Sequence, residues 1–531
     1  AIVIGLAAVI IGEVLCDAFF RKGCNFSVRL GFVVLGGIVY YLVMVLILWL
    51  KLDPNDLKLF TAVIVAAFLV LPLAVAVIYG ESSGIYFLYT MIAAGLLGFL
   101  LTRFKPAKRD MYAREGFVFT ALAWVVISLI GAAPFTLSGQ IPSYLDAVFE
   151  TVSGFTTTGA SILTNVEAMS YGMLYWRSFT HWLGGMGVMV FLLAVIPASG
   201  KGNGFTMHLL RAESPGPNVG KLVPRMRQTA TILYTLYVAL TILCFVFLLF
   251  GGMSPFEAIC TAYGTAGTGG FGIKNDSMAG YSVYIQNVCT VFMILFGVNF
   301  TCYYMLLLGK VKDVLKDEEL KLYLGLIFAS VVLISINTRS MFHSLGETVQ
   351  QVFFQVATII TTTGFATTDF DLWPELSKCI LVMLMFIGAC AGSTGGGIKV
   401  SRILILLKTV KKELGSIVHP RSIKRIRFDD HPVEHEVLRA INVFLIVYLV
   451  IYSFSMLIIS VDGFSFETNF TAVAATLNNI GPGLDLVGPT SNFFGYGPVS
   501  KLILIFDMLA GRLELFPMLI LFYPSTWKKR G

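Results

Sequence analysis

The chain has 531 residues, of which 56% are hydrophobic and only 13% are charged, and its mean hydropathy is +0.81. Soluble domains carry roughly 25% charged residues, so this composition excludes a soluble globular protein and indicates a polytopic membrane protein. The formal net charge of +7 could suggest a nucleic-acid partner, but the distribution of the basic residues, given below, argues against that interpretation.

Apolar segments of membrane-spanning length recur along the whole chain. A crossing helix needs roughly 20 mostly apolar residues, and this criterion predicts about eleven or twelve crossings. The segments lie near 29–50, 59–79, 85–102, 116–134, 174–198, 229–250, 283–308, 320–336, 378–398, 438–461 and 499–523, with a shorter one near 1–19. Arg21, Lys22 and Arg29 would lie outside the cell if both 1–19 and 29–50 cross, so the topology of residues 1–58 stays open.

Basic residues gather in alternate connections between these segments. The connections at 103–114, 199–227, 309–321, 399–439 and 525–531 hold 5, 5, 4, 10 and 3 Lys and Arg residues. The intervening connections at 131–173, 251–287, 337–378 and 461–500 hold 0, 1, 2 and 0. This positive-inside bias places the basic connections in the cytoplasm, so membrane topology explains the net charge and no nucleic-acid partner is expected.

Four short, half-apolar segments interrupt the long ones, and each ends in a turn rich in Thr, Asn and Gly. The short segments are 145–156, 255–266, 347–360 and 466–477. The turns are Thr156-Thr157-Thr158-Gly159, Gly267-Thr268-Gly269-Gly270, Thr361-Thr362-Thr363-Gly364 and Asn478-Asn479-Ile480-Gly481. An acidic residue near the start of each segment (Asp146, Glu257, Glu347 and Glu467) is favourable against a helix dipole. Four half-helices would therefore point their negative C-terminal ends inward, which suits a cation.

The charge alternation keeps its phase only if each short segment returns to the side from which it enters. We therefore predict an all-α polytopic membrane protein with four helix–pore-loop–helix repeats in a pseudo-fourfold arrangement around one ion pore. The predicted divisions are N-terminal transmembrane helices at 1–110 and pore repeats at 111–200, 219–310, 318–412 and 434–525.

Irregular backbone at membrane depth is tolerated only where it packs in protein or lines a water-filled path. Glycine reaches left-handed backbone angles without steric cost, so successive carbonyls can point at one axis, and threonine adds further oxygen ligands for a cation. One such turn would be an ordinary helix cap, but four turns in phase with the topology favour a pore. The predicted cation ligands are Thr157, Thr158, Gly159, Thr268, Gly269, Gly270, Thr362, Thr363, Gly364, Asn478, Asn479 and Gly481.

With these motifs the chain resembles the Trk/Ktr/HKT superfamily of potassium transporters, and most of all its bacterial Trk-type membrane subunits. The resemblance covers roughly residues 59–531 and rests on SGFTTTGA at 153–160, TGGF at 268–271, TTTGF at 361–365 and LNNIGPG at 477–483. It is reinforced by WLGGMG at 182–187, AGSTGGGIK at 391–399 and GRLE at 511–514.

The resemblance implies potassium uptake across the cytoplasmic (inner) membrane, with potassium as the transported ion and no organic cofactor. It implies that Gly159, Gly270, Gly364 and Gly481 are the filter glycines and that the protein is a homodimer with one pore per subunit. Related plant transporters that favour sodium can carry serine at the first of these positions, so Gly159 favours potassium. The alternative is a sodium-permeable or sodium-coupled member of the superfamily.

The resemblance also implies a gate, formed by an intramembrane loop in the third repeat. Gly392, Gly395, Gly396 and Gly397 each disfavour a helix by about 1 kcal/mol relative to alanine. A glycine-rich helix-packing face is the alternative, but the contiguous run favours a loop, with Lys399 anchored at the cytoplasmic interface.

Arg512 lies inside the last apolar segment, where an ionisable residue is a functional candidate by default. In the superfamily the matching arginine faces the permeation path. A buried ion pair with Asp507 or Glu514 is an equally weighted alternative.

The remaining signals are weaker. His431 and His435 favour a solvated turn over a metal site, and His181 is expected to be packed or adjacent to the pore. The eight cysteines lie in or beside apolar segments and are expected to behave as small buried hydrophobes. Enzyme motifs are absent, which predicts a protein that is not an enzyme.

Two kinds of partner are expected. The ten basic residues of 399–439 would attract anionic membrane lipid. The resemblance adds a cytosolic, TrkA-like ring of nucleotide-binding regulatory subunits. An organic-solute carrier is the rival architecture, but such carriers have inverted repeats, whereas these repeats share one orientation. Channel-like and ion-coupled mechanisms stay open.

Overall fold

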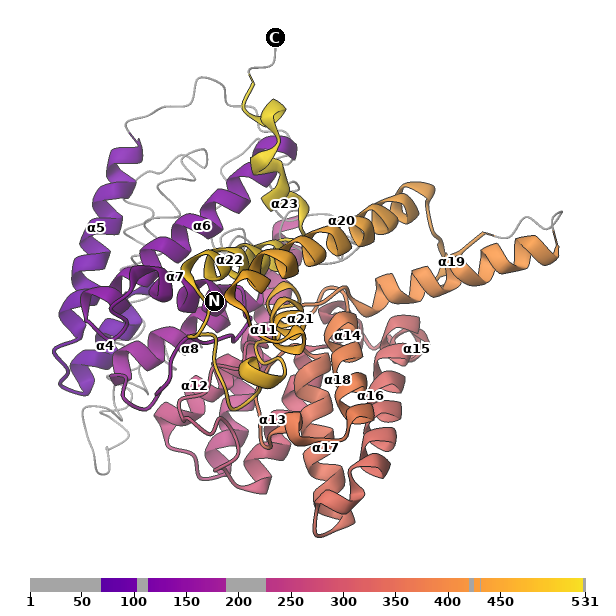
Figure 1. Ribbon diagram of the computed structural model, residues 1–531, viewed down its shortest axis with the longest axis horizontal. Coiled ribbons are helices and arrows are strands. Elements are labelled where there is room, and N and C mark those ends of the chain that lie inside the picture. Colours follow the sequence, from indigo (N-terminus) through magenta and orange to yellow (C-terminus); the bar gives the residue numbers. More distant parts are fainter. Residues whose placement is uncertain (1–67, 103–112, 188–225, 420–424, 430, 529–531) are drawn as a thin grey trace. The chain divides into compact units, whose positions relative to one another are not determined.

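A computed structural model describes residues 68–102, 113–187, 226–419, 425–429 and 431–528 (Figure 1). The chain divides into two compact units, one of residues 1–110 and 170–176 and the other of residues 111–169 and 177–531. The predicted segments 1–19 and 29–50 lie outside the described residues, as do most of the basic connections at 103–114 and 199–227.

The first unit contains two described helices and the first residues of a third. These are α4 (Val70–Ile78), α5 (Gly84–Thr102) and the beginning of α8 (Tyr171–Gly185). Glu81, in the turn between α4 and α5, accepts hydrogen bonds from the backbone N–H groups of Tyr171 at 2.7 Å and Gly172 at 3.0 Å. An acidic side chain thus satisfies the first free N–H groups of α8, where the helix dipole also favours it.

The second unit repeats one pattern four times: a long helix, a short helix, an irregular turn and another helix. The helices are α6 (Ala113–Leu137), α7 (Tyr144–Phe155) and α8; α11 (Met226–Phe250), α12 (Pro255–Ala266), α13 (Val283–Phe296) and α14 (Phe300–Leu307); α15 (Val311–Lys316), α16 (Glu318–Asn337), α17 (Leu345–Ile360), α18 (Glu375–Ile387) and α19 (Val400–Val418); and α20 (His435–Ile459), α21 (Phe466–Leu477), α22 (Pro498–Arg512) and α23 (Phe516–Leu519). The predicted half-helices therefore correspond to α7, α12, α17 and α21.

Short elements complete this unit. Arg427–Phe428 and His431–Pro432 form a two-stranded antiparallel ladder, β1 and β2, before α20. Single 3-10 turns lie at Arg339–Met341, Phe370–Leu372, Ser460–Asp462, Asp485–Val487, Ile520–Phe522 and Pro524–Thr526.

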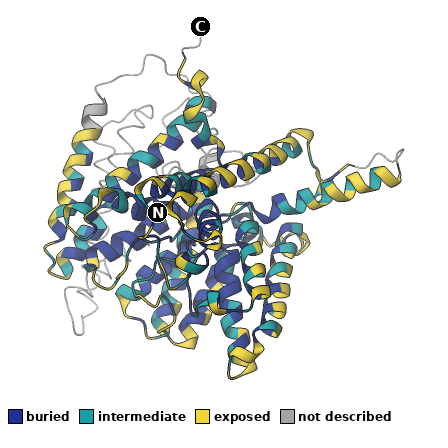
Figure 2. Cartoon of the chain, in the orientation of Figure 1, coloured by how far each residue is buried: buried dark blue, intermediate teal, exposed yellow. Residues whose placement is uncertain are grey.

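Buried residues concentrate on the short helices and the turns that follow them, whereas the distal half of α19 is largely exposed (Figure 2). Phe354 and Ala357 of α17 pack with Phe365 against buried residues of α11, α12 and α13. The opposite side of α17 packs in a second cluster with α16 and α18, including Val352 and Tyr323. Helix α17 is thus packed between longer helices on two sides.

The segment 283–308, expected to be one crossing helix, is bent by 88° between α13 and α14. Gly297 ends α13, and Asn299 begins α14 because its side chain accepts a hydrogen bond from Thr301 N–H at 2.9 Å. The predicted apolar segment is therefore two helices, because hydropathy registers apolar length but does not register a cap inside an apolar run.

Two other predicted crossings are also interrupted. Helix α18 ends at Ile387, within the segment 378–398, and α22 ends at Arg512, within the segment 499–523. After α22, Glu514 and Leu515 adopt left-handed φ angles of 62° and 66°, which no α-helix accommodates. Among the described residues, four helices are long and apolar enough to cross a membrane, and the bent pair α13–α14 would make a fifth.

Candidate functional site

Each of the four short helices begins with the same cap. A serine side chain accepts a hydrogen bond from the backbone N–H three residues later, and an acidic residue stands in the first turn. The capping serines are Ser143, Ser254, Ser344 and Ser465, and the acidic residues are Asp146, Glu257, Glu347 and Glu467. Serine caps and first-turn acids both stabilise a helix N-terminus, so each C-terminal end is left facing its turn.

The turns that follow share one backbone conformation. The second residue after each short helix is left-handed although it is not glycine: Thr157 (φ 55°), Thr268 (51°), Thr362 (57°) and Asn479 (55°). Two residues later each turn has its glycine, also at positive φ: Gly159 (81°), Gly270 (75°), Gly364 (86°) and Gly481 (100°). A left-handed non-glycine residue costs about 1–2 kcal/mol, and strain of this kind is characteristic of functional sites.

The four turns meet in a closed order. A Cβ atom built on Gly159 would lie 2.0 Å from the Gly269 carbonyl oxygen, and one on Gly270 would lie 2.0 Å from the Thr363 oxygen. A Cβ on Gly364 would lie 2.2 Å from the Ile480 oxygen. The order closes at Gly481, whose Cβ would lie 2.8 Å from the Thr158 oxygen and 3.0 Å from the Gly159 carbonyl carbon. Each glycine therefore approaches the next turn closely, and no side chain fits between them.

Ile480 is a residue that our sequence reasoning missed. Its carbonyl holds the position that Thr158, Gly269 and Thr363 hold in the other turns, directly before the glycine. The predicted ligand set contains Asn478, Asn479 and Gly481 of this turn and omits Ile480. Counting back one residue from Gly481 would have identified Ile480, because a carbonyl ligand needs no particular side chain.

The polar side chains of the turns mostly bind protein groups. The hydroxyl groups of Thr156 and Thr158 lie 2.8 Å apart, as do those of Thr361 and Thr363. The Thr268 hydroxyl donates to the Gly267 carbonyl at 2.7 Å.

The asparagines of the fourth turn are held in the same way. Asn478 Oδ1 accepts from the Tyr448 hydroxyl at 3.0 Å, and Asn479 Nδ2 donates to Thr158 Oγ1 at 2.9 Å. The side chains thus brace the turns, and the backbone carbonyls are the better candidates for cation ligands.

An irregular loop, residues 388–399, joins α18 to α19 directly beside the turns. Its Gly396 N–H donates to Thr362 Oγ1 at 2.6 Å, and its Gly397 N–H donates to the Asn478 carbonyl at 3.1 Å. A Cβ on Gly396 would lie 2.3 Å from that same Asn478 oxygen. The glycine run therefore breaks the helix, as predicted, and its missing side chains let the loop reach the backbone of the third and fourth turns.

Lys399 does not anchor at an interface, contrary to our expectation. It is 2% exposed, has a left-handed φ of 87°, and its Nζ donates to the Gly395 carbonyl within the loop. An ammonium group buried without a partner is costly. The Gly395 carbonyl, which belongs to the same loop, is the hydrogen-bond partner of the Lys399 ammonium group.

Arg512 lies between the first turn, the loop and the end of α8. It donates to Thr157 Oγ1 at 3.2 Å, to the Thr394 carbonyl at 2.9 Å and to the carbonyls of Gly184 and Gly185, the latter at 2.6 Å.

The acidic neighbours of Arg512 in sequence have other described partners. Asp507 accepts from the Ser455 hydroxyl at 2.7 Å, and Glu514 binds Arg402. The geometry therefore favours a role for Arg512 at the turns over an ion pair within its own segment.

Glu319, at the start of α16, is a second residue that the sequence did not reveal. It is 4% exposed, and its Oε1 accepts the N–H groups of Ala391 at 2.7 Å and Ser401 at 2.9 Å. One carboxylate oxygen thus holds both ends of the loop. The neighbouring Glu318 binds Lys408 and the Asp429 N–H instead.

The histidine pair and the cysteines show neither a metal site nor a disulfide among the described residues. His431 lies in the strand pair and His435 begins α20, and the described residues, which omit Asp430, contain no group of three His, Cys, Asp or Glu side chains that could hold a metal. The described cysteines are free and buried except Cys379, which is exposed.

The fit of the loop against the fourth turn can be tested by adding one methyl group. We expect Gly396→Ala to lower the free energy of unfolding by about 1–3 kcal/mol because the loop must move away from the Asn478 carbonyl. Thermal unfolding of the detergent-solubilised protein, followed by tryptophan fluorescence, measures this. Gly415→Ala is the matched control, since nothing lies within 4 Å of its Cβ and alanine favours a helix by about 1 kcal/mol. Equal stability of both variants would contradict the fit.

Comparison with known proteins identifies the family. A family model described as TrkH, cation transport protein, matches residues 80–529. The Trk system potassium uptake protein TrkH of Escherichia coli K12 is 38% identical over 470 residues, which span 87% of this chain and 96% of that protein. TrkI of Halomonas elongata is 30% identical over 472 residues, which span 88% and 95% of the two chains. The crystal structure of the potassium transporter TrkH from Vibrio parahaemolyticus superposes with a TM-score of 0.78 at 32% identity, covering 90% of this chain and all of that one. The chain therefore belongs to the TrkH family of cation transport proteins and is a multi-pass membrane protein.

Proposed function

We propose that this chain mediates potassium uptake across the cytoplasmic membrane, through a filter of backbone carbonyls that an intramembrane loop gates. The closed order in which the four turns approach one another carries the proposal. In this order the carbonyl oxygens of Thr158, Gly269, Thr363 and Ile480 each lie against the glycine of a neighbouring turn, which supports one ion path at the ends of the four short helices. The relatives' names, Trk system potassium uptake proteins, supply the ion. Transport, not catalysis, is the proposed activity.

The chemistry of the turns suits a monovalent cation that sheds its water. Carbonyl oxygens replace a hydration shell without introducing a full negative charge, so the ion binds and leaves again. We propose that the predicted ligand set, with Ile480 added, holds potassium as the transported ion. Sodium permeation or sodium coupling is the alternative, and Gly159, the position at which related sodium-favouring plant transporters can carry serine, supports potassium.

We propose that the loop 388–399 closes the path beside the filter. It binds Thr362 and Asn478, and Arg512 ties it to the first turn. Moving the loop away would break these hydrogen bonds and leave the turns facing an open space. Gly392, Gly395, Gly396, Gly397, Lys399 and Arg512 are the proposed gating residues.

Exposed apolar surface and the resemblance to Trk-type subunits support the proposed partners. Apolar residues of α19 are exposed, including Leu414 at 60% and Ile417 at 75%, and a second copy of the chain or membrane lipid would cover them. We propose a homodimer, a TrkA-like cytosolic nucleotide-binding ring that moves the loop, and the four pore repeats with the boundaries predicted above.

Voltage-clamped current through the reconstituted protein tests the function. A reversal potential that follows the potassium gradient at fixed sodium supports passive potassium conduction. One that follows the sodium gradient supports the alternative, and the absence of cation flux under any condition overturns both.

Arg512→Ala removes hydrogen bonds that hold the loop against the first turn. A hydrogen bond to a charged group contributes about 1.5–3 kcal/mol, so we expect a roughly tenfold or greater increase in basal potassium flux, provided that these bonds form only in the closed state. Tracer flux into proteoliposomes measures it, with Arg512→Lys as the variant that keeps the charge. Basal flux at the wild-type level in Arg512→Ala would contradict the proposal that Arg512 holds the loop closed.

Glu319→Ala removes the acceptor that holds both ends of the loop. In the closed loop of this variant, the N–H groups of Ala391 and Ser401 would be buried without an acceptor, which destabilises the closed state. We therefore expect higher basal potassium flux, measured as tracer flux into proteoliposomes that lack the regulatory ring. Glu319→Gln keeps an acceptor and should stay near wild type. Glu318→Ala is the matched control, since Glu318 binds Lys408 and not the loop. Equal flux in the two alanine variants would show that Glu319 does not hold the gate.

A further inference from the structure

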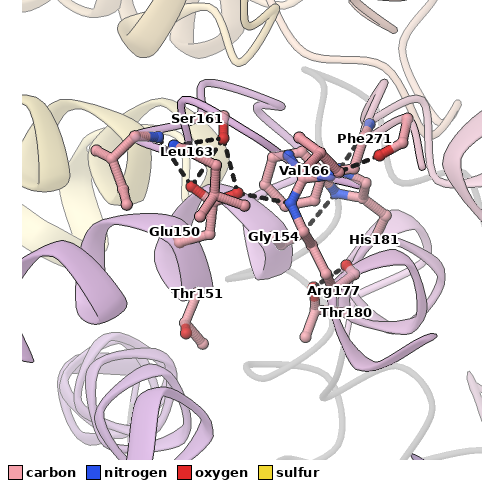
Figure 3. Close-up of polar contacts among 12 residues, drawn as sticks. Glu150, Thr151, Gly154, Ser161, Leu163, Val166, Arg177, Thr180, His181 and Phe271 are labelled. Carbon is pink, nitrogen blue, oxygen red and sulfur yellow. Dashed lines mark hydrogen bonds and ion pairs between the residues drawn. The ribbon is translucent and has the colours of Figure 1, made fainter. Parts of the chain in front are cut away.

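A cluster of polar side chains joins α7 and α8 to the segments that follow the first and second turns (Figure 3). Its centre is an ion pair between Glu150 of α7 and Arg177 of α8, with Arg177 Nε 2.6 Å from Glu150 Oε1. The side chains of this pair are 0% and 3% exposed, the lowest values among the described ion pairs. Buried charge of this kind is costly unless every partner is in place, so the contacts of each residue define what the cluster holds.

Glu150 holds the segment that follows the first turn. Its carboxylate accepts the Ser161 hydroxyl at 3.0 and 3.1 Å and the Ile162 N–H at 3.0 Å. Ser161 stands two residues after Gly159. The segment that follows Gly159 is therefore hydrogen-bonded to α7, the short helix that precedes the same turn.

Arg177 extends the connection to the second turn. Its Nη1 donates to the Gly272 carbonyl at 2.8 Å, and its guanidinium lies 3.5 Å from the centre of the Phe271 ring. Gly272 stands two residues after Gly270, which corresponds to the position of Ser161 in the first turn. The ion pair thus joins equivalent points of two neighbouring turns.

His181 forms a second connection between the same two turns. Its Nδ1 lies 2.8 Å from the Gly154 carbonyl at the end of α7, and its Nε2 accepts the Phe271 N–H at 3.2 Å. These partners require a neutral ring with the proton on Nδ1. A Cβ on Gly269 would lie 2.3 Å from His181 Nδ1, so the ring lies against the residue whose carbonyl faces Gly159.

The other junctions between turns are built differently. The second and third turns meet through the Met278 N–H and the Ala366 carbonyl at 2.9 Å, with Ser277 assisting. Between the fourth and first turns, Asn479 Nδ2 donates to Thr158 Oγ1 and the Phe493 N–H donates to the Ser161 carbonyl, both at 2.9 Å. The ion pair of these two units, Lys501 with Asp146 at 2.6 Å, lies at the start of α7, far along the helix from the turn.

We propose that Glu150, Arg177 and His181 are positioning residues that fix the separation of the first and second turns and thereby set the preference for potassium over sodium. The inference rests on the proposed function and assigns the selectivity of that pore to one junction. A filter discriminates by the size of its cage or by the number and rigidity of its carbonyls. A buried and fully bonded network resists both contraction around a smaller ion and rotation of the Gly269 carbonyl.

The test compares ion selectivity with overall stability. His181→Phe keeps an aromatic ring but removes both hydrogen bonds, and Glu150→Gln removes the charge while keeping an acceptor. We expect each variant to raise sodium permeability relative to potassium by roughly tenfold, measured as a shift in reversal potential with potassium on one side of a bilayer and sodium on the other. In Glu150→Gln the Arg177 guanidinium keeps an amide oxygen and the Gly272 carbonyl as acceptors. Arg177→Ala is less suitable because it removes the contact with Gly272 together with the charge and leaves the Glu150 carboxylate buried without a counter-ion.

Ser377→Ala is the matched control. It removes one partly buried hydrogen bond, from Asn337 Nδ2 at 2.8 Å, between the end of α16 and the start of α18. It should lower thermal stability without moving the reversal potential.

Unchanged reversal potentials in both His181→Phe and Glu150→Gln, with potassium-selective wild-type current, would overturn this inference alone. Wild-type protein without potassium selectivity would overturn the proposed function. If one variant does not fold, the reversal potential of the other decides.

Discussion

The structure depends on one steric constraint: each of the four turns passes so close to the next that only a glycine fits at the point of contact. A Cβ at Gly159 or Gly270 would lie 2.0 Å from a neighbouring carbonyl oxygen, well inside any tolerated contact. In this arrangement each turn also contains one strained, left-handed residue that is not glycine. The serine caps and the enclosing helices stabilise the short helices that deliver the turns. Closure of the four turns around one place is thus what the surrounding fold supports.

The two broken helices beside the turns form one feature. The bend after α13 releases the carbonyls of Phe296 and Gly297 from helical pairing. The loop after α18 uses them: Cys390 N–H donates to Gly297 at 3.1 Å, and the Thr394 hydroxyl donates to Phe296 at 3.2 Å. A buried backbone group needs a partner, and here each broken end satisfies the other. A straight helix over 283–308 would leave the loop without these acceptors, so the two interruptions require each other.

Much of the fold and part of the site could be predicted from the sequence because their signals are local and repeated. First-turn acids and turns rich in Thr, Asn and Gly recur in phase, so all four short helices were located to within two residues at each end. Features that depend on distant partners were missed. Glu150 and Arg177 stand 27 residues apart, and Glu319 binds groups 72 and 82 residues away. Ile480 was missed for another reason, since the position of a backbone carbonyl leaves no trace in the side chain of its residue.

The fourfold backbone is held by side chains that are not fourfold. Charged groups join the first and second turns, whereas the second and third meet through backbone and a serine. The loop comes only from the third unit, and among the described hydrogen bonds it reaches the third and fourth turns through its own N–H groups and the first through Arg512. Four identical subunits would have to repeat any gate or brace four times. In a single chain with four diverged repeats, one repeat can supply the loop and another can supply the buried ion pair. A substitution in the loop therefore need not alter the contacts of the ion pair.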